Sequence, residues 1–229
     1  LSGINRVLRS FRVNATMVGL GFRFTTMLAQ VVVSVGYAVL MALVNTFSVD
    51  IVSGYVAAYR LDALCSIPMV QFGNAMATFT GQNVGASQFD RVPQGIRAAA
   101  LMCVIVWILF VVLVQLFGHQ MIGWFMEEGV GEAAYNAGIQ YMKIMSSVYI
   151  LLGLMYIYAA TLRGAGDAII SVIAVILNFG GRCAFAYIMV AVTGSELAIW
   201  WSNPIGWLIA LAICFFRFRT GIWKTKRLA

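Results

Sequence analysis

Six long apolar segments decide what this chain can fold into. They cover residues 15–46, 51–80, 97–118, 137–162, 168–192 and 197–216. Each is long enough to cross about 30 Å of hydrocarbon at a helical rise of about 1.5 Å per residue. Only helices or closed barrels satisfy their backbone in lipid, and the segments lack the alternation typical of barrel strands. The sequence therefore predicts an all-α integral membrane protein, a bundle of six transmembrane helices.

The composition argues against a soluble enzyme or a nucleic-acid-binding protein. Hydrophobic residues make up 62% of the 229 residues and charged residues 10%, whereas soluble domains average about half and about a quarter. The short connections leave no room for a catalytic domain, and the net charge of +7 is better explained by cytoplasmic flanks than by nucleic acid. Cys65, Cys103, Cys183 and Cys214 are far apart, with no CxxC pair, so neither a disulfide framework nor a metal site is indicated.

Basic and acidic residues flank the segments on opposite sides of the membrane. The cytoplasmic flanks would carry Arg6, Arg9, Arg12, Arg91, Arg97, Arg163, Arg217, Arg219, Lys224, Lys226 and Arg227. The opposite connections hold Asp50, Glu127, Glu128, Glu132 and Glu196, without Lys or Arg. The positive-inside rule then places both ends in the cytoplasm of a protein of the cell membrane. We expect a basic cytoplasmic arm at 1–14, a transmembrane region at 15–216 and a basic cytoplasmic tail at 217–229.

Asp62 is the only acid in the interior of a predicted span. It lies about 17 Å along its helix, where a charge costs about 2.5 to 3.5 kcal/mol on insertion scales. Two interpretations are open: a group that titrates or binds a cation, or a structural ion pair that fixes helix packing. Arg60 is the nearest cation in sequence but points in a different direction on a helix. Arg182 is an alternative partner from another helix.

Polar and aromatic residues follow the same face as Asp62. Tyr55, Tyr59 and Ser66 recur at helical spacing with it, which predicts a polar and aromatic stripe. Pro68 removes a backbone hydrogen bond from this helix and is predicted to bend it.

Two later spans carry further candidates for a binding cavity. The segment 137–162 has a stripe of Tyr141, Met145, Tyr149, Tyr156 and Ala160. Such a face can contact flat organic cations through stacking and cation–π attraction, although ordinary packing explains the same pattern. In the next span Asn178 and Arg182 share a face, and Arg182 is deep enough to require a partner. We expect this pair to bridge helices.

A series of short motifs runs through the chain in order. They are residues 57–62 (Ala-Ala-Tyr-Arg-Leu-Asp) with Pro68, 81–86 (Gly-Gln-Asn-Val-Gly-Ala) with Arg91, 162–167 (Leu-Arg-Gly-Ala-Gly-Asp), Asn178 with Arg182, 203–207 (Asn-Pro-Ile-Gly-Trp) and 221–224 (Gly-Ile-Trp-Lys). In this order and spacing the chain resembles the C-terminal lobe of the multidrug and toxic compound extrusion (MATE) family of transporters. The resemblance covers residues from about 15 to 223.

The resemblance implies a twelve-helix antiporter of two six-helix lobes. Such proteins export amphipathic organic cations or other toxic compounds in exchange for H⁺ or Na⁺ by alternating access, and they need no cofactor. Residues 1–14 would then link two lobes. The implied partners are membrane lipids, small amphipathic substrates, and the absent N-terminal lobe or a second copy. On this basis the candidates for the cavity or for ion coupling are Asp62, Tyr59, Arg60, Tyr55, Tyr149, Tyr156, Asn178 and Arg182.

The glycine-containing motifs have an expected structural role. Residues 81–86 read as a polar, glycine-flanked break after an apolar span. The resemblance places Gly81, Gln82, Asn83 and Gly85 at the cytoplasmic end of that helix, where they would cap it and shape the loop. A structural role is likewise expected for Pro68, Arg163, Gly164 and Gly166.

Two other functions compete with export. A lipid-linked oligosaccharide flippase of the wider superfamily would need a markedly cationic cavity, for which Arg60, Lys143 and Arg182 are available. An integral-membrane enzyme would need a convergent acid/base set at one face of the membrane. Only Glu127, Glu128 and Glu132 approach such a set, and a solvated acidic loop explains them better.

Overall fold

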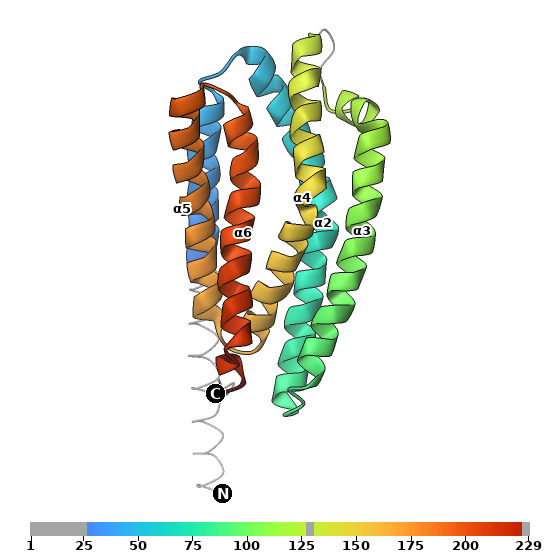
Figure 1. The fold of residues 1–229 in the computed structure, drawn as a ribbon, viewed down its shortest axis with the longest axis vertical. Helices are drawn as coiled ribbons and strands as arrows, with labels where there is room; N and C mark the ends of the chain where they lie inside the picture. The colour runs from blue at the N-terminus through green and yellow to red at the C-terminus, as the bar shows by residue number, and fades with distance from the viewer. Residues whose placement is uncertain (1–26, 127–130, 226–229) are drawn as a thin grey trace, which may run out of the picture.

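The bundle consists of long helices joined by short connections (Figure 1). A computed structural model describes residues 27–126 and 131–225 of the chain. The described part contains a helix over Met27–Val44, followed by α2 Val49–Gly85, α3 Arg91–Gly123, α4 Glu132–Gly164, α5 Ala168–Thr193, α6 Leu197–Arg219 and the short 3-10 helix η1 Ile222–Thr225. No strand occurs among the described residues. The predicted all-α membrane bundle is confirmed.

Helix α2 differs from the other five long helices in composition. Those five are long and apolar enough to cross a membrane, whereas α2 is not among them. Its 37 residues would extend over about 55 Å, but polar side chains such as Arg60, Asp62 and Gln71 are spread along it. The helix continues through Pro68 without interruption. It runs the length of the bundle beside α4 (Figure 1), and hydropathy alone therefore misses it as a span.

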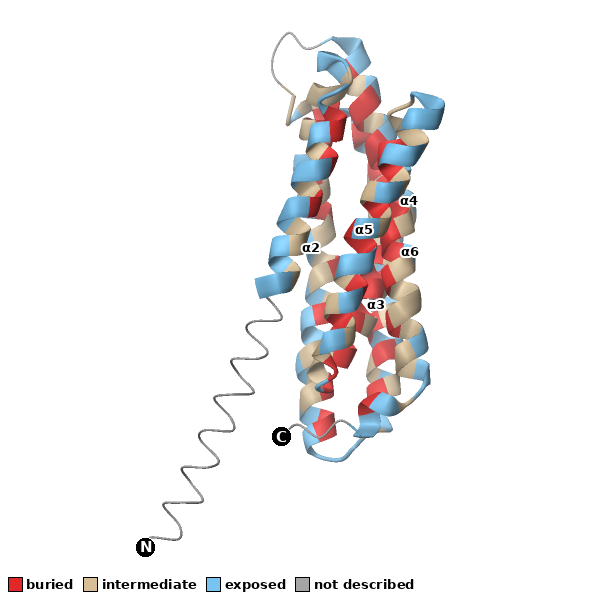
Figure 2. Ribbon diagram, turned by 90° about the vertical axis from the view of Figure 1, so that its left-hand side faces the viewer, coloured by how far each residue is buried: buried red, intermediate tan, exposed pale blue. Residues whose placement is uncertain are grey.

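Helix α4 is the centre of the bundle. It contacts α2, α3, α5 and α6, and Figure 2 shows buried residues along the inward faces of the helices. Small residues permit its close approach to α2: a Cβ on Gly54 would meet the carbonyl oxygen of Ala134, and one on Gly138 would lie 3.0 Å from the carbonyl oxygen of Gly54. Near the other end, a Cβ on Gly164 would meet the α2 backbone. Close backbone packing of this kind stabilises helix pairs in lipid, where apolar burial between helices gains little.

Residues 81–86 lie at the end of α2, but the helical backbone continues through most of them. Helix α2 continues to Gly85, and the chain leaves the helix at Ser87, whose φ of 59° is left-handed. The amide of Gln88 donates to the carbonyl of Asn83 at 2.7 Å, a six-to-one bond typical of helix ends. The polar Asn83 fits within the helix because its side chain donates to the Phe79 carbonyl at 2.8 Å.

The turn between α4 and α5 depends on Gly166. Its φ of 87° is left-handed, a conformation that costs glycine little. Its amide donates to the carbonyl of Arg163 and the next amide, from Asp167, donates to that of Leu162, which closes the end of α4. The Asp167 side chain is 3% exposed and accepts from Arg217 Nε at 2.7 Å. This ion pair ties the start of α5 to the end of α6.

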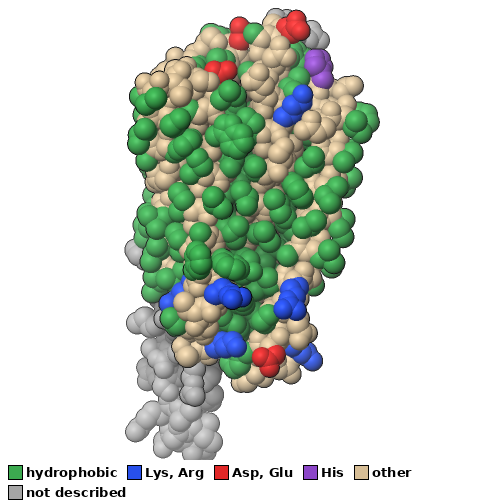
Figure 3. Space-filling view, viewed as in Figure 1, with side chains coloured by type: hydrophobic (Ala, Val, Ile, Leu, Met, Phe, Trp, Pro, Cys, Tyr) green, Lys and Arg blue, Asp and Glu red, His purple; other side chains and the backbone are tan. Residues whose placement is uncertain are grey.

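Charge is segregated between the two ends of the bundle. Figure 3 shows Lys and Arg gathered mainly at the end where α2 joins α3 and α4 joins α5, and acids mainly at the other end. The boundary predicted at residue 217 falls inside α6, and Trp223 beyond it is 1% exposed and stacks on Phe218. The described part of the predicted tail is thus folded onto the bundle. The predicted arm at 1–14, together with Glu127 and Glu128, lies outside the described residues.

Candidate functional site

A polar cavity of about 110 Å³ lies between five helices. Its walls come from the Met27–Val44 helix, α2, α4, α5 and α6, through Val33, Tyr37, Tyr59, Asp62, Ser66, Val70, Leu152, Met155, Tyr156, Asn178, Phe179, Arg182, Asn203 and Trp207. Asp62 lies about 20 Å from the start of α2, and Arg182 about 21 Å from the start of α5. The cavity therefore opens deep within the bundle, where charged side chains in membrane proteins usually serve a function.

Two tyrosines of α4 hold the Asp62 carboxylate. Tyr149 Oη donates to Asp62 Oδ1, and Tyr141 Oη donates to Oδ2 at 3.4 Å. Asp62 forms no ion pair with any described residue; the ion pair found in residues 27–126 and 131–225 joins Arg217 to Asp167. The two hydroxyl groups donate hydrogen bonds that offset part of the free-energy cost of burying the carboxylate, but they leave its negative charge in place. The structural ion pair considered for Asp62 is thus absent from the described part of the chain.

Removing the Tyr149 hydroxyl should destabilise the protein through Asp62. We expect Tyr149→Phe to lower the free energy of unfolding by about 1 kcal/mol, the usual size of hydrogen bonds measured in membrane proteins. A double-mutant cycle with Asp62→Asn measures the coupling between the two side chains. Tyr158→Phe is the matched control, because the Tyr158 hydroxyl forms no hydrogen bond with the described residues. Equal losses for both tyrosines would contradict the assignment.

An aromatic cluster fixes one of these tyrosines. Tyr55 of α2 and Trp200 of α6 stack with centroids 5.2 Å apart and planes 2° apart. Tyr141 meets both rings edge-on, with centroid distances of 5.4 Å to each. The three rings join α2, α4 and α6, and they orient the Tyr141 hydroxyl towards Asp62. The predicted stripe on α4 is therefore in part packing and in part a set of donors to the carboxylate.

Arg182 lies on the other side of the cavity without an acid partner. The residue is 2% exposed, and its guanidinium carbon lies 5.0 Å from the Phe179 ring centre and 5.5 Å from that of Tyr37. Its Nε atom and the Oδ1 atom of Asn178 are buried without a hydrogen-bond partner. A Cβ on Gly206 would collide with both side chains, so this glycine of α6 makes their placement possible. Arg182 therefore contacts another helix through the Tyr37 ring rather than through an acid.

The structure brings most of the predicted site residues together. The cavity is lined by Tyr59, Asp62, Tyr156, Asn178 and Arg182, and Tyr149 contacts it through Asp62.

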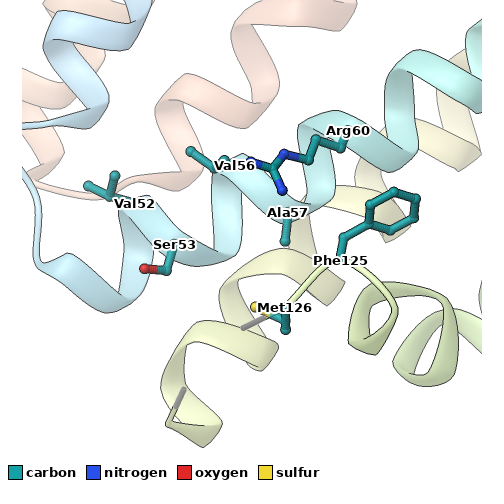
Figure 4. Close-up of a pocket in the computed structure, with 7 residues that line it drawn as sticks. All are labelled: Val52, Ser53, Val56, Ala57, Arg60, Phe125 and Met126. Carbon is teal, nitrogen blue, oxygen red and sulfur yellow. The ribbon is translucent and has the colours of Figure 1, made fainter. Parts of the chain in front are cut away.

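Arg60 lies apart from the cavity, as its spacing of two residues from Asp62 predicts. It lines an apolar groove of about 350 Å³ with Tyr37, Ala38, Met41, Tyr55, Val56 and Tyr59. It also lines a pocket of about 170 Å³ next to Phe125 and Met126 (Figure 4). Its exposed side chain is available to solvent or headgroups rather than to Asp62.

Sequence reasoning missed several residues of the cavity wall, among them Tyr37, Asn203 and Trp207. Tyr37 is the one polar aromatic in the apolar run of the Met27–Val44 helix, four residues after Val33, and this isolation was a usable signal. Asn203 and Trp207 were noted only as part of a motif, although they also share a face at a spacing of four. The described residues contain no group of three or more His, Cys, Asp or Glu that could hold a metal.

The family model named MatE matches residues 26–188. The chain belongs to the MATE family. Members of this family are transporters rather than enzymes, and the chain is a multi-pass membrane protein. Two curated relatives from Bacillus subtilis (strain 168) are named probable multidrug resistance proteins. YoeA is 26% identical over 201 residues, which are 87% of this chain and 42% of YoeA. YpnP is 26% identical over 202 residues, which are 88% of this chain and 44% of YpnP.

Solved transporters share the fold of this MATE chain. A MOP superfamily transporter from Pyrococcus furiosus matches with a TM-score of 0.81 at 20% identity, over 89% of this chain and 46% of that one. A MATE family transporter in its outward-facing conformation matches with a TM-score of 0.79 at 21% identity, over 89% of this chain and 46% of that one. One in an inward-facing conformation matches with a TM-score of 0.75 at 19% identity, over 89% of this chain and 47% of that one. The chain thus spans about half the length of the proteins it matches and corresponds to one lobe.

Proposed function

We propose that this chain is one lobe of a multidrug exporter that exchanges amphipathic organic cations or other toxic compounds for H⁺ or Na⁺. The observation that carries the proposal is the cavity with the Asp62 carboxylate. Asp62 is the only carboxylate that lines it, and it is held by tyrosine hydroxyls rather than by a cation. Such a group can accept a proton or face a cationic substrate. The names of the Bacillus relatives, probable multidrug resistance proteins, support the same substrate class.

The likeness to both transport states supports alternating access. The lobe matches an outward-facing and an inward-facing transporter with similar scores. A lobe that fits both states is a unit whose internal packing changes little, and rocking of one such unit against another exposes a site to each side in turn. The close backbone contacts between α2 and α4 supply the stiffness that this movement needs. The second unit is the other lobe of the same protein or a second copy of this chain.

The charge distribution supports an orientation in the cell membrane. Arg91, Arg97, Arg163, Arg217 and Arg219 lie at the ends of helices that meet at one end of the bundle. The positive-inside rule assigns this end to the cytoplasm. The acidic end, with Asp50, Glu132 and Glu196, then faces outward. The C-terminal end of α6 is cytoplasmic in this arrangement.

Ethidium efflux tests the proposal. In cells that express the complete two-lobed transporter, we expect export of ethidium by the wild type and a fall of about tenfold or more for Asp62→Asn, because the substituted amide can neither titrate nor carry charge. Asparagine keeps an oxygen that accepts from the tyrosines, so the fold should persist. Asp90→Asn is the matched control, since Asp90 is exposed in the connection between α2 and α3. Imposed proton and sodium gradients, applied separately, distinguish the coupling ion.

Each possible result has a distinct meaning. Unimpaired export by a correctly inserted Asp62→Asn variant would contradict a coupling or binding role for Asp62. A wild type that exports none of a panel of cationic dyes would contradict export itself and would favour the lipid-linked oligosaccharide flippase.

A further inference from the structure

The cavity presents two opposite charges that form no direct ion pair. Asp62 and Arg182 both line it, yet no ion pair joins them, which places their charged atoms more than 4.0 Å apart. Asp62 accepts hydrogen bonds from two tyrosines, whereas Arg182 Nε has no partner. A buried N–H group that is left without an acceptor is costly. An anionic group in the cavity beside Arg182 would supply that acceptor.

We propose that the cavity is a zwitterion site, in which Arg182 and Asn178 receive the carboxylate of a substrate and Asp62 faces its cationic group. This inference rests on the proposed function, and it narrows the substrate class from organic cations to amphipathic zwitterions. Arg182 is the selecting residue, because a purely cationic substrate gains nothing from it. A substrate that carries both charges would pair its carboxylate with Arg182 and its cationic group with Asp62.

The surroundings of Arg182 prepare it for a carboxylate. Its guanidinium packs against the rings of Phe179 and Tyr37, whose centres lie only 5.2 Å apart, so both rings lie on one side of the guanidinium. Planar N–H donors at the edge of a guanidinium match the two oxygens of a carboxylate. Asn178 Nδ2 contacts the Met155 sulfur at 3.7 Å, a weak acceptor that a ligand oxygen can replace. Both residues are held in place against Gly206.

An apolar groove next to the cavity accommodates the body of such a substrate. The groove of about 350 Å³ shares Tyr37 and Tyr59 with the polar cavity. Its remaining wall includes Met41 and Tyr55, side chains that contact flat ring systems well, together with Arg60. A molecule with a ring system in the groove and its charged groups in the cavity would contact both at once.

A pair of dyes that differ in one carboxylate tests this proposal. Rhodamine B carries a cationic ring system and a free carboxylate, and its ethyl ester carries only the cation. Fluorescence anisotropy would measure binding of each dye to the full chain in phosphatidylcholine nanodiscs, after subtraction of protein-free nanodiscs. We expect the acid to bind about tenfold more tightly than the ester, as for one charge-assisted hydrogen-bonded pair. Arg182→Gln should remove this preference, lowering the affinity for the acid about tenfold and leaving that for the ester unchanged.

A control variant and two contradicting results make the dye-binding test decisive. Arg97→Gln is the control, because Arg97 is an exposed arginine of α3, and it should keep the preference. Asp62→Asn should weaken both dyes, since both carry the cation. A wild type that binds the acid no more tightly than the ester overturns the proposal without any variant, and so does an Arg182→Gln variant that weakens both dyes equally. Failure of export would appear separately, as cells that retain ethidium while the purified chain still prefers the acid.

Discussion

Replacing Trp200 by alanine is expected to lower the free energy of unfolding by about 3 kcal/mol or more, the range of large aromatic truncations in packed interiors. Trp200 is 0% exposed and is among the largest fully buried side chains of the described residues. It stacks on Tyr55 and meets Tyr141 edge-on, so its loss opens a cavity where α2, α4 and α6 meet. Unfolding by SDS in mixed micelles, followed by circular dichroism, measures the change.

The neighbouring tryptophan supplies the control for this experiment. Trp201 is 47% exposed and lies on the outer face of the same helix turn. In lipid an exposed apolar side chain gains little from the fold, so Trp201→Ala should change the free energy of unfolding by less than about 1 kcal/mol. Similar losses for both variants would contradict the packing described for Trp200. Trp200→Ala should also weaken the donation from Tyr141 to Asp62, since the ring that orients Tyr141 is gone.

The helices could be predicted because the membrane leaves few alternatives. A long apolar segment in lipid must close its own backbone hydrogen bonds, and segments such as 168–192 and 197–216 therefore matched α5 and α6 within three residues. The ends were less predictable, since helices continue beyond the hydrocarbon. Helix α2 passes through residues 81–85 because Gln82 is exposed and the Asn83 side chain is satisfied by the Phe79 carbonyl. The left-handed backbone of Ser87 marks the point where the chain leaves the helix.

The candidate site was predictable in its members but not in its contacts. A carboxylate at the depth of Asp62 must face protein or water, so its place in the interior followed from the sequence. Its partners did not: Tyr141 and Tyr149 lie 79 and 87 residues away, and helical spacing on one element says nothing about which neighbour it faces. Arg182 was expected to bridge helices, but only the packed structure shows that it contacts the aromatic ring of Tyr37 on another helix instead of an acid.

Glycine-to-alanine substitutions are expected to act in opposite directions at two positions of the bundle. At Gly54 the added Cβ would meet the Ala134 carbonyl oxygen and lie 3.0 Å from both the Ala137 Cβ and the Gly138 amide nitrogen. Two of these three neighbours are backbone atoms, which cannot turn away, so α2 and α4 must separate. We expect Gly54→Ala to lower the free energy of unfolding by about 2 kcal/mol, as overpacking does in other tight interiors. Thermal and SDS unfolding of the full chain in detergent measure it.

The exposed Gly180 of α5 isolates this steric effect from helix propensity. A Cβ there meets nothing within 4 Å, so Gly180→Ala should stabilise the helix by up to about 1 kcal/mol. A loss at Gly54 and a gain at Gly180 would show that the approach of α2 to α4 limits which residues fit, and Gly164→Ala should repeat the loss near the opposite end of α4. If Gly54→Ala instead stabilises the protein as Gly180→Ala does, the two helices are not in backbone contact. The stiffness that a rocking lobe requires would then have to come from other helix pairs.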